Sequence, residues 1–311
     1  MAIPTLAMIP SGYKAGKLYS VLPSDGTGDF TVARNSKATR VNQSGLIEEV
    51  GVNVPRLDYS AGGCPVLLTE ISSTNECRYS QDFSNSVWNT GATRSVTFVP
   101  SPIVDLEGQT NAYRMTSTAS DNQVAILNTV TSGAGYTNSI YVKRVSGTGD
   151  VALRDVNNVA TFFPLSDADG WKRLSVTSLT SSANGRLYIN LETIGDSIDI
   201  WGAQTEQQPA ATSYIKTTSA QTREADLVNG AGSAATFNSL EHTFFLDLNS
   251  LFDGGVISDI SIVGSAGTVT DNRILIRKQA NNTSLDFSIR SGASNVAGET
   301  LVNIDFSIKQ K

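Results

Sequence analysis

The sequence predicts an all-β protein with an irregular, extended N-terminal module (residues 1–75), a jelly-roll β-sandwich (76–228) and a second β-sandwich (229–311). Three observations lead to this prediction. Charged residues make up only 17% of the chain, and Ser, Thr, Asn and Gly, which compete with helical hydrogen bonding, take their place. Apolar residues recur with a period of two, as in half-buried strands. No long segment keeps a 3.6-residue period with capping signals, so helices should be short and few.

The N-terminal module is predicted from turn clusters that alternate with short extended pieces. Turns are expected at 23–26 and 42–45, and pieces such as 30–34 and 46–50 are too short to close a core alone. Apolar side chains nevertheless argue against disorder, namely Val41, Leu46, Ile47, Val50, Val54 and Leu57. A long segment of this kind needs something to cover it. We therefore expect these residues to lie against a partner chain.

The first sandwich is predicted from regular alternation in the middle of the chain. The clearest case is 186–192, where Leu187, Ile189 and Leu191 share one face. Turns rich in Gly, Asn and Asp separate the strands, and Asn184-Gly185 predicts a tight hairpin. Many short strands at even spacing are typical of a sandwich or a jelly roll.

The second sandwich follows a small, polar stretch at 223–236, which predicts a domain boundary. Strands are expected at 243–248, 273–277, 284–290 and 302–309. No turn or polar cap follows the last of these, and an uncapped strand leaves a sticky edge. We therefore expect this sandwich to be incomplete and the natural polypeptide to continue past residue 311.

Composition argues against several classes of function. The net charge is −6 with an isoelectric point near 4.9, and no Lys/Arg cluster is present, which argues against nucleic-acid binding. No run approaches the roughly 18 apolar residues that span a bilayer, so no membrane insertion is expected. The N-terminus lacks a basic region, and Pro4 and Pro10 interrupt its apolar stretch, so it does not resemble a signal peptide. We expect the protein to mature in a cytoplasm.

Catalytic and metal chemistry find little support. The two cysteines, Cys64 and Cys77, are interpreted as free thiols, with a disulfide between them as the alternative. The single histidine, His242, has no neighbouring partner for a catalytic triad. The carboxylate pairs Glu48–Glu49 and Asp105–Glu107 are interpreted as surface acids, and 167–170 as a turn rather than a calcium loop. We therefore expect no enzyme, no metal and no cofactor.

Aromatic side chains in the first sandwich are the remaining binding candidates. Tyr141, Tyr188 and Trp201 lie in predicted strands. Most such rings pack in a core. The two tyrosines share strands whose other face is aliphatic, so their rings would point outward. These three residues are the candidates for stacking on a sugar.

Several motifs resemble the N-terminal module and following jelly roll of fibre and appendage proteins of tailed bacteriophages, including crAss-like phages. They are FTVARNSKATRVN (30–42), GLIE (45–48), NVPRLDY (53–59), CPVLLTE (64–70), STN (73–75), YSQDFSN (79–85) with Trp88, GWKR (170–173), WGAQTE (201–206), ATSYI (211–215) and TREAD (222–226). The resemblance covers roughly residues 18–228 and does not separate head from tail fibres. Beyond residue 229 the pattern resembles a concanavalin-like or laminin-G-like sandwich only in its alternation.

The resemblance implies a virion protein that forms a homo-oligomer, a trimer or a dimer, and binds capsid or tail proteins through its N-terminal module. The interface candidates are Arg40, Val41, Leu46, Ile47, Val54, Arg56 and Leu57. Ion pairs between Lys37, Arg40 or Arg56 and nearby acids would set the register between chains. The family implies no catalytic residues.

The sequence therefore predicts a head or tail fibre whose sandwiches adhere to host-surface glycans by multivalent binding. Two alternatives remain open within the virion: a glycan-degrading fibre enzyme, and a connector or decoration protein without a host ligand. A secreted, host-encoded carbohydrate-binding module would require the signal peptide that the N-terminus does not resemble.

Overall fold

The computed structural model describes residues 4–88, 96–118, 122–232, 236, 243, 245, 258–263, 273–279, 284–291 and 294–302. The chain divides into two compact units, Met1–Gly232 and Ser233–Lys311. The N-terminal module and the first sandwich therefore belong to one unit. In the described residues the regular elements are strands, apart from two short 3-10 helices, η1 (Ser86–Trp88) and η2 (Asp167–Asp169). The all-β prediction is confirmed.

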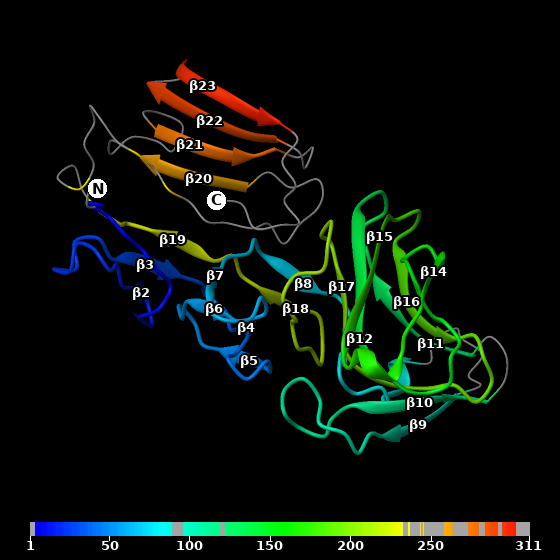
Figure 1. Cartoon of the computed structure of the whole chain (residues 1–311). Helices are drawn as coiled ribbons and strands as arrows, with labels where there is room; N and C mark the ends of the chain where they lie inside the picture. Colours follow the sequence, from blue (N-terminus) through cyan, green and yellow to red (C-terminus); the bar gives the residue numbers. More distant parts are fainter. Residues whose placement is uncertain are drawn as a thin grey trace. The chain divides into compact units, whose positions relative to one another are not determined.

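The N-terminal module consists of short strands in four small antiparallel sheets (Figure 1). One sheet has the order β1-β2-β3-β19, with β1 at Tyr13–Lys14, β2 at Lys17–Leu18, β3 at Phe30–Ala33 and β19 at Leu227–Asn229. The others pair β4 (Ala38–Val41) with β5 (Ile47–Val50), β6 (Arg56–Asp58) with β7 (Val66–Leu68), and β8 (Ser73–Asn75) with β18 (Gln221–Arg223). Strands β18 and β19 follow the sandwich in sequence, so the end of the unit returns to its beginning.

Local turn chemistry explains the β4–β5 hairpin. The Asn42 side-chain oxygen accepts hydrogen bonds from the amides of Ser44 (2.9 Å) and Leu46 (3.1 Å). Gly45 adopts a φ of 78°, which a residue without a Cβ tolerates. The predicted turn at 42–45 is therefore present, and it sets the register that pairs Arg40 with Glu48.

The sandwich has two antiparallel sheets. The five-stranded sheet has the order β15-β12-β17-β10-β9, and the four-stranded sheet has the order β11-β16-β13-β14. Their strands are β9 (Val96–Pro100), β10 (Tyr113–Ser117), β11 (Asn122–Thr129), β12 (Gly135–Ser146), β13 (Val151–Arg154), β14 (Ala160–Phe163), β15 (Lys172–Leu179), β16 (Asn184–Leu191) and β17 (Ser197–Glu206). Figure 1 shows this sandwich in green, with β12 and β15 in one layer and β16 in the other.

Alternation along the strands fills the space between the two sheets. Leu187, Ile189 and Leu191 of β16 are fully buried in the core, together with Ile198 and Ile200 of β17. Successive side chains along a strand point to opposite faces, so every second residue of these strands points into the core. The face predicted for 186–192 is the core face.

The Asn184-Gly185 hairpin prediction is wrong. These residues begin β16, and the strand before them, β15, belongs to the opposite sheet. The glycine is required by packing instead: a Cβ on Gly185 would lie 2.9 Å from a Val130 side-chain carbon. At this position the Asn-Gly dipeptide lets the Val130 side chain pack closely against the backbone of β16 instead of forming a tight turn.

A buried polar bridge connects the two sheets. The Asn138 amide on β12 donates to the carbonyls of Arg154 (3.0 Å) and Arg186 (2.8 Å) in the opposite sheet. Its oxygen accepts from the Thr205 hydroxyl (2.7 Å). Because the three bonds satisfy this buried amide, Asn138 fixes the alignment of the sheets.

The unit Ser233–Lys311 contains one antiparallel sheet in its described part, in the order β20-β21-β22-β23. The strands are β20 (Ser258–Val263), β21 (Arg273–Lys278), β22 (Ser284–Ser291) and β23 (Ser294–Val302). The strands predicted at 273–277 and 284–290 are present as β21 and β22. His242, most of the strand predicted at 243–248, and residues 303–309 lie outside the described residues.

Candidate functional site

The outer face of the five-stranded sheet carries two of the predicted sugar-stacking residues. Trp201 follows the core residue Ile200, so its side chain points away from the core. Tyr141 is its partner in the register between β12 and β17, and their ring centroids are 5.5 Å apart. Tyr214 packs on the Trp201 ring at 4.6 Å. The three rings form the floor of an apolar cluster outside the sandwich core.

The N-terminal module covers this floor. Ile47 of β5 is buried in the same cluster, and Val41 of β4 packs beside it. Trp201 is consequently 0% exposed, so the prediction that it stacks on a sugar is wrong. The Tyr141 ring is half-buried, with the Arg173 guanidinium 5.1 Å from its centroid. Its visible role is to hold the module against the sandwich.

Several of the residues predicted to lie at an interface between chains make their contacts within this chain instead. Leu57 packs with Leu18 and Val32 in a second apolar cluster, and Arg56 is fully buried. Ile47, Arg56 and Leu57 therefore obtain their burial from their own chain rather than from sister chains, which corrects the expectation for these three. The half-buried members of the set are Arg40, Val41, Leu46 and Val54.

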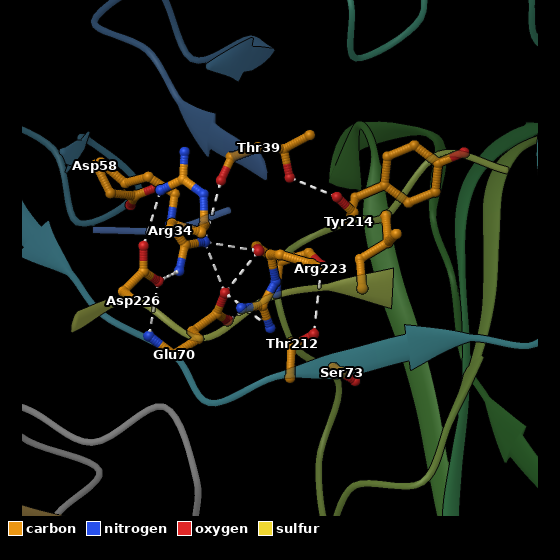
Figure 2. A network of polar contacts seen from close by, with 12 residues as sticks. Arg34, Thr39, Asp58, Glu70, Ser73, Thr212, Tyr214, Arg223 and Asp226 are labelled. Carbon is orange, nitrogen blue, oxygen red and sulfur yellow. Dashed lines mark hydrogen bonds and ion pairs between the residues drawn. The ribbon is translucent and has the colours of Figure 1, made fainter. Parts of the chain in front are cut away.

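A buried ionic network joins the module to the end of the unit (Figure 2). Arg34 lies 2.8 Å from one Asp226 oxygen, and Arg56 contacts the other. Arg56 also donates to Glu70 at 2.6 Å, and Arg223 of β18 lies 3.4 Å from the same Glu70 oxygen. The side chains of these five residues are at most 2% exposed.

Neutral groups complete the network. Glu70 accepts from the Ser213 amide (2.8 Å) and hydroxyl (2.6 Å), and Arg56 donates to the Thr39 carbonyl (3.2 Å). The Thr39 hydroxyl donates to the Tyr214 carbonyl at 2.5 Å, a contact visible in Figure 2. The bonds of Ser213 and Tyr214 link the module to the segment that follows β17, and the Arg56–Thr39 bond ties β6 to β4 within the module. The two parts are therefore held in one arrangement.

The electrostatics of the network follow from burial and pairing. Burial alone would raise the pKa of Glu70, but the charges of Arg56 and Arg223 and the bonds from Ser213 outweigh it and lower that pKa below 4.5. Burial lowers the pKa of Arg223, which the nearby acids offset only in part. Breaking one pair would leave an uncompensated buried charge, which is strongly destabilising.

The ion pairs expected between chains form within one hairpin. Arg40 lies 2.7 Å from Glu48, and Lys37 lies 2.6 Å from Glu49, across β4 and β5. Both Lys37 and Glu49 are more than half exposed, so this pair contributes little energy. These charges therefore lie across the register between β4 and β5 within one chain, rather than a register between chains.

The outer face of the four-stranded sheet, on the opposite side of the sandwich, carries a different set of side chains. We call it the outer-face patch: Arg154, Phe162, Arg186, Tyr188 and Asn190. These residues alternate with the core residues of β13, β14 and β16. The register places Arg154 beside Tyr188, and Ala152 between Asn190 and Phe162.

Two arginines line this patch. Arg186 donates to the Tyr188 hydroxyl and lies 5.7 Å from the centroid of its ring. Arg154 donates to the Asn190 oxygen at 3.3 Å. Tyr188 is only 3% exposed, so it does not offer a free ring face, and the stacking prediction for it is wrong. The exposed aromatic ring is that of Phe162, at 53%.

Sequence reasoning missed Phe162 although a signal was present. In the pair Phe162-Phe163, the second ring packs on the core, so the first must point outward. An exposed ring beside guanidinium groups and a small residue is an arrangement suited to sugars, which combine apolar C–H faces with hydroxyl groups.

The candidate carboxylate pairs have structural roles. The Asp105 carboxylate accepts hydrogen bonds from the amides of Glu107 (2.8 Å), Gln109 (2.9 Å) and Asn111 (3.2 Å), which organises its loop. Glu107 pairs with Lys216 at 3.0 Å. In the turn at 167–170, Asp169 pairs with Lys172, whose hydrogen bond lowers the pKa of Asp169 to about 2.

The structure also shows the state of the two cysteines and the arrangement of possible metal ligands. Cys64 is an exposed free thiol, and Cys77 is a buried free thiol in the sandwich core, so the free-thiol interpretation holds. Burial raises the pKa of Cys77. Within the described residues, no three His, Cys, Asp or Glu side chains gather as metal ligands would. In the same part of the chain, no helix has the length and apolar character needed to cross a membrane.

Comparisons with known proteins find distant structural similarity only. No protein-family model and no curated protein matches the sequence. Among solved structures, a putative sugar-binding protein from Bacteroides thetaiotaomicron has 12% identity and a TM-score of 0.31, over 43% of this chain and 100% of that one. A carbohydrate-binding module of Cellvibrio mixtus lichenase 5A, in complex with cellotriose, has 10% identity and a TM-score of 0.30, over 43% and 96%. The enzymatically active domain of bacteriophage CBA120 tailspike protein 4 has 15% identity and a TM-score of 0.28, over 42% and 21%.

Proposed function

We propose that the protein is a virion fibre of a tailed bacteriophage that attaches to the particle through its N-terminal module and binds host-surface glycans through its first sandwich. The observation that carries the proposal is the geometry of the first unit. One outer face of the sandwich is covered by the module through the Trp201 cluster and the buried ionic network. The opposite outer face carries the patch around Phe162.

This arrangement suits a mechanical adhesin. Force on a bound glycan has to pass from the sandwich to the particle, and a junction of buried charges and packed rings resists relative movement. The strands β18 and β19 add a second connection because they return to the module from the far end of the unit. The resemblance of residues 18–228 to phage appendage proteins supports the same assignment.

The module offers an exposed apolar surface for attachment. Residues 7–13 and 19–22, which we call the N-terminal arms, run antiparallel, with Ala7 bridged to Leu22 and the Tyr19 amide donating to the Gly12 carbonyl at 3.0 Å. They expose large apolar side chains, namely Ile9, Tyr13, Tyr19 and Val21. Exposed apolar surface favours association. We propose that these arms contact sister chains, in a trimer or a dimer, and the virion protein beneath.

Binding rather than catalysis is the activity that we propose, without a cofactor. Glu48, Glu49 and Glu107 are each engaged in an ion pair, and Asp105 in backbone hydrogen bonds. A pair of glycosidase carboxylates must instead face a shared substrate across roughly 5–10 Å.

A glycan array tests the adhesive role. The full chain should bind at least one glycan series, and Phe162→Ala should weaken that binding by about tenfold, the loss of one stacked ring. Leu179→Ala is the matched control, because Leu179 is 71% exposed on the opposite sheet. Absence of binding to every glycan, or equal binding by both variants, would contradict the role of the patch. Release of reducing sugar by the wild-type chain would show an enzyme.

Two further measurements test the virion assignment. Light scattering of the full chain in solution should give an oligomer, and Ile9→Ser with Tyr19→Ser should shift it towards the monomer. Gold-labelled antibodies against the sandwich should decorate the periphery of intact particles. A protein absent from purified particles would overturn the assignment.

A further inference from the structure

A second surface of the sandwich has the features of a ligand site. A cleft of about 380 Å³ lies at the edge formed by β11, where the chain leaves β8. We call it the edge cleft; its lining residues include Glu76, Arg78, Leu127, Asn128, Thr129 and Asn184. This volume falls in the lower part of the range for small-molecule sites.

The chain presents two opposite charges to this cleft. Cys77 points into the core and is 0% exposed, while its neighbours Glu76 and Arg78 both line the cleft. The Glu76 amide donates to the Thr205 carbonyl at 2.9 Å, which fixes the segment. Neither charged side chain makes a hydrogen bond or an ion pair with any described residue. Arg114 and Arg144 of the same sandwich, by contrast, are paired with aspartates.

Asn128 of β11 contributes to the wall of the same cleft. The Asn128 side chain is 2% exposed, and its amide nitrogen donates to the Thr205 hydroxyl at 2.9 Å. Its oxygen has no hydrogen-bond partner among the described residues. Because this oxygen is buried and Asn128 points to the same side of β11 as the core residue Ile126, Asn128 shapes the wall of the cleft and does not present this oxygen to a ligand.

The electrostatic setting favours a ligand that donates hydrogen bonds. Burial raises the pKa of Glu76, and no cation offsets that effect. A partly desolvated carboxylate gains more from a hydroxyl donor than one in open water. Leu127 adds an apolar side chain to the lining of the cleft.

We propose that the edge cleft is a saccharide subsite that takes a neutral sugar residue. Glu76 accepts hydrogen bonds from its hydroxyl groups, Arg78 donates to its oxygens, and Leu127 contacts its C–H face. An anionic sugar is disfavoured by Glu76, and a cationic one by Arg78. The inference rests on the proposed glycan-binding function and names its ligand class.

The cleft and the outer-face patch are neighbours on the same sheet. Leu127 of β11 pairs in register with Arg186 of β16, and Thr129 pairs with Asn184. A glycan seated in the cleft can therefore continue across Arg186 towards Phe162. Short saccharides would use the cleft, and longer ones would use both.

Calorimetric titration of the full chain tests the inference. The probes are neutral di- and hexasaccharides of glucose, mannose, galactose and N-acetylglucosamine, with hexagalacturonate and chitosan hexamer as charged counterparts. We expect Glu76→Gln and Arg78→Ala each to weaken binding of a neutral disaccharide by about tenfold or more, the effect of one hydrogen bond to a charged group. Phe162→Ala should weaken the hexasaccharide alone. Glu49→Gln and Lys37→Ala, an exposed pair outside the sandwich, are the matched controls.

The outcomes separate the two proposals. Binding that Phe162→Ala abolishes but Glu76→Gln and Arg78→Ala leave unchanged would overturn the subsite and keep the glycan-binding function. Binding restricted to a charged hexamer would overturn the ligand class. Failure of every probe to bind the wild-type chain would overturn both. Circular dichroism of each variant establishes that a loss of binding is not a loss of fold.

Discussion

Arg56 and Asp226, which are 170 residues apart in the sequence, form a buried ion pair. The pair joins the N-terminal module to the segment after the sandwich, and Glu70 extends it to Arg223. A module whose strands are too short to form a core is thus held by charges that are removed from water. The stability of the first unit should depend on this junction.

Removing Arg56 should destabilise the first unit strongly. Arg56→Met deletes the cation between Glu70 and Asp226, and breaking a buried pair in this way costs about 3–5 kcal/mol. Urea unfolding of the full chain, followed by tryptophan fluorescence, measures the change. Lys37→Met removes an exposed pair instead, and its effect should stay below about 1 kcal/mol. Equal effects of the two substitutions would show that the network contributes no more than a surface pair.

The network should also make the first unit sensitive to acid. The pKa of Glu70 is lowered in the folded chain from its usual 4.5. A lowered carboxyl pKa stabilises the fold above the unfolded value, and that contribution is lost as the pH falls from about 4.5 through the lower, folded pKa. Glu70→Gln should therefore be less stable than wild type at neutral pH, and the difference should narrow below about pH 4.5. A difference that stays constant down to about pH 2 would rule out this linkage.

Ile47 tests the apolar half of the junction. Ile47→Ala leaves a cavity against Trp201 and Tyr214, and large-to-small substitutions of this kind cost about 2–5 kcal/mol. The emission of Trp201 should shift to longer wavelength if water enters the cavity. Val52→Ala, at a side chain that is 47% exposed, should change stability by less than about 0.5 kcal/mol. An Ile47→Ala variant as stable as wild type would argue that the module packs elsewhere.

The bridge between the sheets makes a separate prediction. Asn138→Leu removes three hydrogen bonds and leaves two buried carbonyls without their donor. We expect a loss of about 2–4 kcal/mol, since each unsatisfied buried group costs about 1–3 kcal/mol. Thr161→Leu, at an exposed position of β14, serves as the control for the added apolar volume. Calorimetric unfolding of the full chain gives both values.

The sequence alone determined the local features of this protein. The period of two in 186–192 predicted a strand with Leu187, Ile189 and Leu191 inward, and the structure buries all three. The turn residues at 42–45 predicted the first hairpin. These features depend on neighbours a few positions away, so a single chain segment contains the information.

Only the tertiary structure decided what the outward-facing side chains touch. The sequence predicted sugar stacking for Tyr141 and Trp201 and an interface between chains for Ile47, yet the three side chains meet one another because the module folds back over the sandwich. Phe162, by contrast, stays exposed. Alternation predicts that a side chain points away from the core. It does not predict whether another segment covers that side chain, because the covering residue lies more than a hundred positions away in the sequence. The same limit applies to Arg56, whose partner Asp226 is defined by the return of the chain rather than by any local pattern.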